Sequence, residues 1–121
     1  MSFVSSAIYS LYWVRDEPTR LAETGEAEAT VLDRTAERIA QCWRTMNGQV
    51  RQDGRYLLGD CLSVLDLYVT VVSRWQPRRL RFYREAPRMA EVVRRVDAEP
   101  RLRAHWEERY PFAGAWESEG P

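Results

Sequence analysis

Apolar residues recur every three or four positions over much of the chain, which is the spacing of one face of an α-helix. The clearest stretches are residues 3–14, residues 26–49 and residues 63–75. The apolar seam of the second stretch alternates steps of four and three: Leu32, Ala36, Ile39, Trp43, Met46 and Val50. Such a seam suits antiparallel packing against another helix. Pro87 and Pro100 suit the first turns of two further helices, and no stretch convincingly predicts a strand. We therefore expect an all-α fold, a bundle of five or six helices.

The first of these stretches has two unlike faces. Its apolar face carries Phe3, Val4, Ala7, Ile8, Leu11 and Val14. The opposite face carries Ser5, Ser6, Tyr9 and Trp13. Large aromatic side chains four residues apart are unusual on a face that meets only water. Pro18 then interrupts the pattern, and residues 15–25 predict a loop. The aromatic face is therefore either a binding surface or a surface packed under that loop.

The third stretch opens with a helix-start signal. Ser63 followed by Asp66 predicts a capping box, and Leu62 with Leu67 predicts a hydrophobic staple across the same turn. Residues 67–72 have the propensity of a strand, but the cap, the staple and the length to Trp75 favour a helix that Pro77 closes. Apolar residues surround most of this helix, so we expect it to be buried on most sides. A narrow polar stripe remains: Ser63, Asp66, Thr70, Ser73 and Arg74.

Composition narrows the class of protein. The 121 residues are enough for one domain, and 45% apolar with 30% charged residues fits neither a disordered nor a membrane protein. No apolar run is long enough to span a membrane, and the N-terminus lacks the basic start of a signal peptide. With only two cysteines there is no disulfide framework, which indicates a reducing, cytoplasmic location.

Charge is balanced overall but not locally. The chain has 18 basic residues, all arginine, against 18 acidic residues, so it has no net field that would attract nucleic acid. The absence of lysine excludes a lysine nucleophile or Schiff base in this chain. Residues 74–88 hold six arginines and one acid, with Trp75, Phe82 and Tyr83 between them. Such a segment can bind a polyanion, but acids elsewhere in the chain are available to pair with it, and we favour the self-paired interpretation.

Single residues give little catalytic signal. His105, the one histidine, has no designated partner, and we expect a surface or half-buried imidazole. We expect Cys42 to be a buried, inert thiol, whereas Cys61 precedes the Ser63 cap, where helix amides can activate a thiol. No spacing of histidine and cysteine predicts a metal site, and no arrangement predicts a catalytic residue.

The segment from Tyr56 to Leu67, read as Tyr-Leu-Leu-Gly-Asp-Cys-Leu-Ser-Val-Leu-Asp-Leu, closely resembles the start of the buried central helix in the C-terminal domain of glutathione S-transferases. That family has the pattern Tyr-Leu-x-Gly-Asp-x-x-Ser/Thr-x-x-Asp. Trp75, the Ala-Pro-Arg-Met start at residues 86–89 and Pro100 follow in the order that the family shows. One departure is Leu65, where the family usually has alanine. The resemblance implies a helical domain over residues 1–112, followed by a loose tail at residues 113–121.

The resemblance also implies that two domains share the function. Glutathione S-transferases carry a thioredoxin-like domain ahead of the helical one, which holds most of the glutathione site and the thiol-activating residue, and this sequence contains none of it. No catalytic residue and no cofactor are therefore expected here, and glutathione enters only as co-substrate of the two-domain protein. The helical domain supplies the wall for a small hydrophobic electrophile. The residues that match this wall are Ser5, Tyr9, Tyr12 and Trp13, with Arg74 and Trp75 as weaker candidates.

Two functions follow. The first is the hydrophobic co-substrate-binding domain of a glutathione S-transferase-like protein, inactive alone, with the thioredoxin-like domain as its partner and a homodimer as a possible assembly. The second is a non-catalytic module of the same fold that binds proteins or an RNA-associated partner, although direct nucleic-acid binding is not expected. A redox sensor built on Cys61 is a third possibility.

Overall fold

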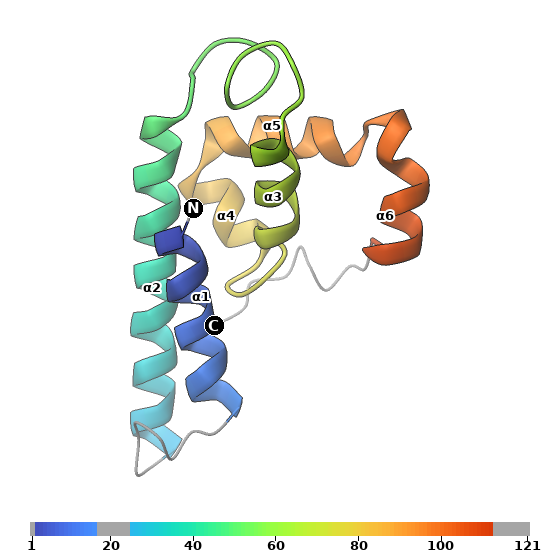
Figure 1. Cartoon of the computed structure of the whole chain (residues 1–121). Coiled ribbons are helices and arrows are strands. Elements are labelled where there is room, and N and C mark those ends of the chain that lie inside the picture. The colour runs from blue at the N-terminus through green and yellow to red at the C-terminus, as the bar shows by residue number, and fades with distance from the viewer. Residues whose placement is uncertain (1, 17–24, 113–121) are drawn as a thin grey trace.

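Helices make up the structure, a computed structural model that describes residues 2–16 and 25–112 (Figure 1). In chain order the elements are α1 (Ser2–Asp16), α2 (Gly25–Gln49), α3 (Val64–Val72), α4 (Arg79–Glu85), α5 (Pro87–Asp97), the 3-10 turn η2 (Pro100–Leu102) and α6 (Arg103–Arg109). The described residues contain no strand beyond an isolated bridge between Tyr56 and Gly59. The all-α prediction is therefore confirmed. The expected loose tail, and most of the expected loop at residues 15–25, lie outside the described residues.

α1 and α2 form an antiparallel pair, in which the shorter α1 lies along part of α2 (Figure 1). The apolar seam of α2 is buried as its spacing predicts, with Ala36, Ile39 and Trp43 at its centre. The facing side of α1 is nearly inaccessible: Val4, Ala7, Ile8 and Leu11. Burial of such side chains, worth about 1.5–3 kcal/mol for each large one, drives this pairing.

Two positions in α1 differ from the prediction. Phe3, which the spacing assigns to the apolar face, is 41% exposed, whereas Ser5, assigned to the opposite face, is buried. Ser5 is covered because Tyr68 reaches across from α3, and the two hydroxyl groups lie 2.8 Å apart in a hydrogen bond. Periodicity within one helix does not reveal a neighbour that is distant in sequence.

α3 packs against α5, and it differs from its prediction in its length and in how much of it is buried. It ends at Val72, three residues before Trp75, and the chain then turns through a cis Gln76–Pro77 bond into α4. The predicted polar stripe is the buried side of α3: the side chains of Asp66, Thr70 and Ser73 are almost inaccessible. Their hydrogen bonds make this burial possible, since Thr70 Oγ1 donates to the Asp66 carbonyl and Ser73 Oγ to the Thr70 carbonyl. The expectation that α3 is buried on most sides is therefore wrong for its apolar outer side.

Arginines of the basic segment bind acids and carbonyls of the domain itself. Arg81 pairs with Glu85 in its own helix and with Glu37 of α2. Arg44 of α2 pairs with the same two acids, and its hydrogen bond, together with the cations beside it, lowers the pKa of Glu37. These ion pairs join α2 to α4, in the way the self-paired interpretation predicts.

Arg88 of α5 binds the loop between α2 and α3. Its guanidinium donates to the backbone carbonyls of Arg51, Asp53 and Gly54. Gly54 has φ of +85°, and a Cβ there would lie 3.0 Å from the Gly59 carbonyl oxygen. The loop therefore requires glycine at this position.

We predict opposite effects for two glycine substitutions. Gly54→Ala should destabilise the protein by about 1–2 kcal/mol, because alanine disfavours a positive φ. Gly48→Ala should stabilise it by about 0.5–1 kcal/mol, because Gly48 lies in α2 with no atom near its Cβ position. Urea unfolding followed by circular dichroism measures both changes, and equal effects of the two substitutions would contradict the loop geometry.

Candidate functional site

The start of α3 is built around one buried carboxylate. Asp66 is inaccessible to solvent; its Oδ2 accepts hydrogen bonds from the backbone N–H of Ser63 at 2.7 Å and from the Ser63 hydroxyl at 2.9 Å. Its Oδ1 accepts a third, at 2.9 Å, from the backbone N–H of Leu57 in the preceding loop. Ser63 is the N-cap residue of α3 and Asp66 its third residue, the positions that a capping box uses. The carboxylate thus fixes both the helix start and the loop before it, which sets the direction of α3.

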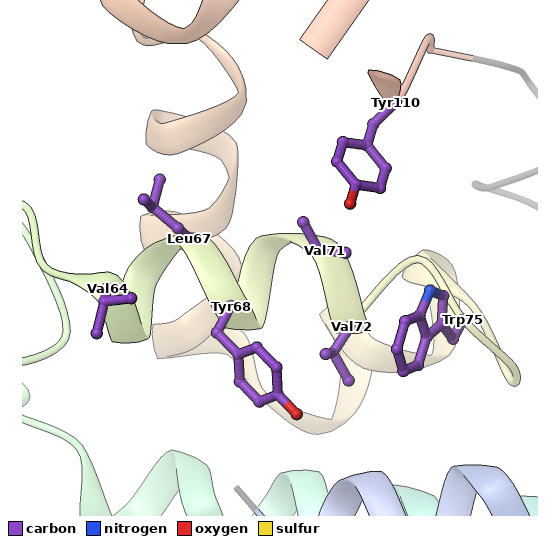
Figure 2. A pocket seen from close by; sticks show the side chains of 7 residues that line it. All are labelled: Val64, Leu67, Tyr68, Val71, Val72, Trp75 and Tyr110. Atoms are coloured by element: carbon purple, nitrogen blue, oxygen red, sulfur yellow. The ribbon is translucent and has the colours of Figure 1, made fainter. Parts of the chain in front are cut away.

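The outer side of α3 lines an open groove of about 380 Å³. Its lining residues are Val64, Leu67, Tyr68, Val71, Val72, Trp75 and Tyr110 (Figure 2). Val64 is 80% exposed and Tyr68 42% exposed, which are high values for large apolar side chains on a helix. Figure 2 shows the ring of Tyr110, which follows α6, pointing toward Val71 across the groove. The groove therefore joins α3 to the end of α6.

A second hollow, of about 410 Å³, lies on α1 and is lined by Ser6, Tyr9, Ser10 and Trp13. Tyr9 is 59% exposed and Trp13 49% exposed, so the aromatic face that the sequence singled out is accessible. Residues 17–24, which belong to the loop predicted at residues 15–25, lie outside the described residues.

The two hollows adjoin through contacts between α1 and α3. The rings of Tyr9 and Trp75 lie 5.9 Å apart between centroids, and Ser5 and Tyr68 share the hydrogen bond described above. We call the combined lining of the groove and the hollow the neutral face, because every described residue that lines it is uncharged. In a chain with 30% charged residues this is an unusual stretch of surface.

The predicted wall residues divide into two groups. Tyr9, Trp13 and Trp75 lie on the neutral face. Ser5 and Arg74 are buried and line neither hollow. The half-buried Tyr12 turns inward, and its hydroxyl oxygen accepts a hydrogen bond from the Gln76 backbone N–H at 3.3 Å. The inner group therefore supports the face rather than forming it.

Sequence reasoning missed the groove itself. Val64, Tyr68, Val71 and Trp75 are spaced by four, three and four residues, the repeat of a helix-packing seam. This spacing can be read from the sequence, but it does not show whether the seam packs inside the domain or against another protein. Tyr110 joins the groove from a distant part of the chain, and no local pattern predicts it.

The other candidate residues do not line the neutral face. Cys42 is half-buried, and this burial raises the pKa of its thiol. Cys61 is exposed, and His105 is an exposed side chain beside the rings of Trp106 and Tyr110. Among the described residues no group of three or more histidine, cysteine, aspartate or glutamate side chains could hold a metal ion, and no helix is long and apolar enough to cross a membrane.

The fold and the site together define an all-helical domain with an uncharged, partly aromatic face. A family model described as the C-terminal domain of glutathione S-transferase matches residues 10–109. Because this match covers well over half of the chain, the protein belongs to that family, as the Tyr56–Leu67 segment indicates. Searches among curated proteins and among solved structures gave no match.

We predict a graded loss of stability at the start of α3. Asp66→Ala should cost about 2–4 kcal/mol, because three buried or part-buried donors lose a charged acceptor. Ser63→Ala should cost only about 0.5–2 kcal/mol, the range for a helix cap. Asp33→Ala, at an exposed position of α2, is the control and should change stability by less than about 0.5 kcal/mol. Urea titration gives all three values, and an Asp66→Ala protein as stable as the control would contradict the role of this carboxylate.

Proposed function

We propose that this chain is the hydrophobic co-substrate-binding domain of a glutathione S-transferase-like protein. Joined to a thioredoxin-like domain, it would help conjugate glutathione to small hydrophobic electrophiles, with glutathione as co-substrate rather than resident cofactor. The observation that carries this proposal is the neutral face. A cytoplasmic location and a homodimeric assembly belong to the same proposal.

The α1 hollow has the chemistry of a wall for a neutral aromatic molecule. Tyr9 and Trp13 offer ring faces against which a planar ligand can stack, and Ser6 and Ser10 line the same hollow. Because no lining residue is charged, an apolar ligand binds there without stripping water from an ion. This makes Tyr9 and Trp13 the residues that would touch the electrophile.

The α3 groove has the chemistry of a surface for another protein domain. Its apolar residues follow the spacing of a helix-packing seam, and Val64 at one end is 80% exposed. Covering such a surface removes apolar area from water, at about 25 cal/mol for each Å². We place the thioredoxin-like domain here, next to the electrophile wall that the Tyr9–Trp75 contact joins to the groove.

Glutathione itself requires groups that the neutral face does not offer. Glutathione is an anionic peptide, and its carboxylates are best bound by cations or by exposed backbone N–H groups. Arg74, directly after α3, and Arg79, the first residue of α4, are buried and bind Asp97. The proposal therefore assigns glutathione binding and thiol activation to the thioredoxin-like domain.

A non-catalytic interaction module is the second candidate. The helix-packing repeat of the groove favours it, since that repeat would serve any protein with a matching apolar helix. The observation that separates the candidates is the aromatic α1 hollow, which suits a small ligand. A module needs only the groove.

We predict that the 121-residue chain alone conjugates glutathione to an aryl halide no faster than the uncatalysed reaction. The physical reason is that the described residues of the neutral face include no cation that would bind the glutathione carboxylates or stabilise its thiolate. A spectrophotometric assay of product formation measures the rate, with an intact two-domain glutathione transferase as positive control. Robust turnover by the chain alone would overturn the assignment of thiol activation to another domain.

We also predict that the α1 hollow binds N-phenyl-1-naphthylamine, a neutral dye whose fluorescence rises in apolar surroundings. Trp13→Ala should weaken this binding about tenfold, or about 1.4 kcal/mol, because the dye loses a stacking surface. Leu58→Ala removes an exposed apolar side chain outside the face and should leave the affinity unchanged. If both variants bind the dye as the unmodified protein does, the hollow is not the ligand wall.

A further inference from the structure

Arg74 lies directly after α3, yet its side chain points away from the solvent and is only 3% exposed. Its guanidinium Nη1 donates to the backbone carbonyl of Tyr110 at 2.8 Å, and Nη2 donates to Asp97 Oδ1 at 3.4 Å. One bond thus reaches the residue that walls the groove, and the other reaches the end of α5. Arg74 therefore joins the C-terminal end of α3 to two later elements.

Three aromatic rings surround the same guanidinium. Its central carbon lies 5.1 Å from the ring centroid of Trp106, 5.5 Å from that of Tyr110 and 5.2 Å from that of Phe112. A cation within about 6 Å of an aromatic ring is attracted to it, and more so where water is excluded. These three rings belong to α6 or to the residues just after it.

α6 depends on such contacts for its place. It is a helix of seven residues, too short to be stable alone, and it stands at the far end of α5 from α2 (Figure 1). Trp106 is buried and donates its Nε1–H to the Val96 carbonyl at 3.2 Å, which fixes one side of the helix. Tyr110 comes after the last helical residue, and Arg74 is the side chain that ties its backbone to α3.

Asp97 and Arg79 hold Arg74 in this position. Arg79, itself buried, donates to Asp97 Oδ2 at 2.7 Å and to the Thr70 carbonyl of α3 at 2.8 Å. Burial, and next the charge of Arg79, lower the pKa of Arg74 to about 10, so it is still a cation at neutral pH. Asp97 and Arg79, which help to place the Arg74 cation, do not line the groove.

We propose that Arg74 is a positioning residue for the neutral face. Its guanidinium holds Tyr110 as the outer wall of the α3 groove, and the groove therefore owes its shape to a side chain that does not contact the occupant. This inference rests on the proposed function in one respect, namely that the groove binds an apolar partner.

The test measures binding of N-phenyl-1-naphthylamine at two places in one molecule by NMR. The methyl signals of Val71 report the dissociation constant at the groove, and the indole N–H signal of Trp13 reports that at the α1 hollow. Arg74→Met should weaken binding at the groove by about tenfold and change binding at the hollow by less than about twofold. Arg74→Lys should lie between, since an ammonium can donate to the Tyr110 carbonyl but cannot make the forked contact with Asp97 as well.

Arg88→Met is the matched control, because Arg88 is also a largely buried arginine that binds carbonyls, but it lies away from the groove. It should alter neither dissociation constant. A measurement without dye completes the test: the order parameter of the Tyr110 backbone N–H should fall in Arg74→Met and not in Arg88→Met.

Other results for the Arg74→Met variant would overturn the positioning role of Arg74. The positioning role would be overturned if Arg74→Met binds the dye at the groove as tightly as the unmodified protein does. It would also be overturned if the variant loses the same affinity at the groove and at the hollow. An unchanged order parameter of Tyr110 in that variant would overturn it as well. If the dye shifts no Val71 signal in the unmodified protein while Tyr110 loosens in Arg74→Met, the groove takes no small apolar molecule, and the anchoring of Tyr110 by Arg74 stands.

Discussion

The carboxylate of Asp66 is the interaction on which the rest of the structure depends. It is fully buried and accepts hydrogen bonds from the loop before α3 and from the helix cap, so loop and helix share one anchor. That anchor sets the direction in which α3 crosses the bundle. Once the direction is set, the side that carries Asp66 faces the core and the side that carries Val64, Tyr68 and Val71 faces outward. The groove side of the neutral face is thus a consequence of the hydrogen bonds that one buried carboxylate accepts.

The polar side of α3 can be buried because its polar groups find hydrogen-bond partners inside the domain. Thr70, Ser73 and Arg74 are tolerated inside because each finds an acceptor there: the Asp66 carbonyl, the Thr70 carbonyl, and Tyr110 together with Asp97. On the outer side, Val64 and Tyr68 remain 80% and 42% exposed at the groove. A domain that exposes valine and tyrosine while it buries arginine is typical of one that works against an apolar partner.

Sequence periodicity predicted the helices well and their outward faces poorly. The seam of α2 at Ala36, Ile39 and Trp43 is buried as its spacing requires, because its partner α1 is the neighbouring helix in the chain. The side of α3 that faces outward was not predictable from local pattern. Asp66 accepts from the Leu57 backbone N–H in the preceding loop, and Arg74 donates to Asp97 and Tyr110, which are far from it in sequence. Tyr9 and Trp13 were found from their spacing alone, whereas Val64 and Tyr110 became part of the candidate site only once α3 and α6 were placed.

Apolar ligands are proposed to bind at the neutral face. Fluorine NMR of the protein labelled with 5-fluorotryptophan measures this binding at individual tryptophan side chains. Trp13 and Trp75 lie on the face, whereas Trp43 and Trp106 are each only 2% exposed in the core. The remaining signal, from Trp116, is identified in a Trp116→Phe variant and set aside. When a neutral aromatic ligand is titrated in, the signals of Trp13 and Trp75 should move and those of Trp43 and Trp106 should stay. Movement of the two core signals alone, or of none of the four, would contradict the account.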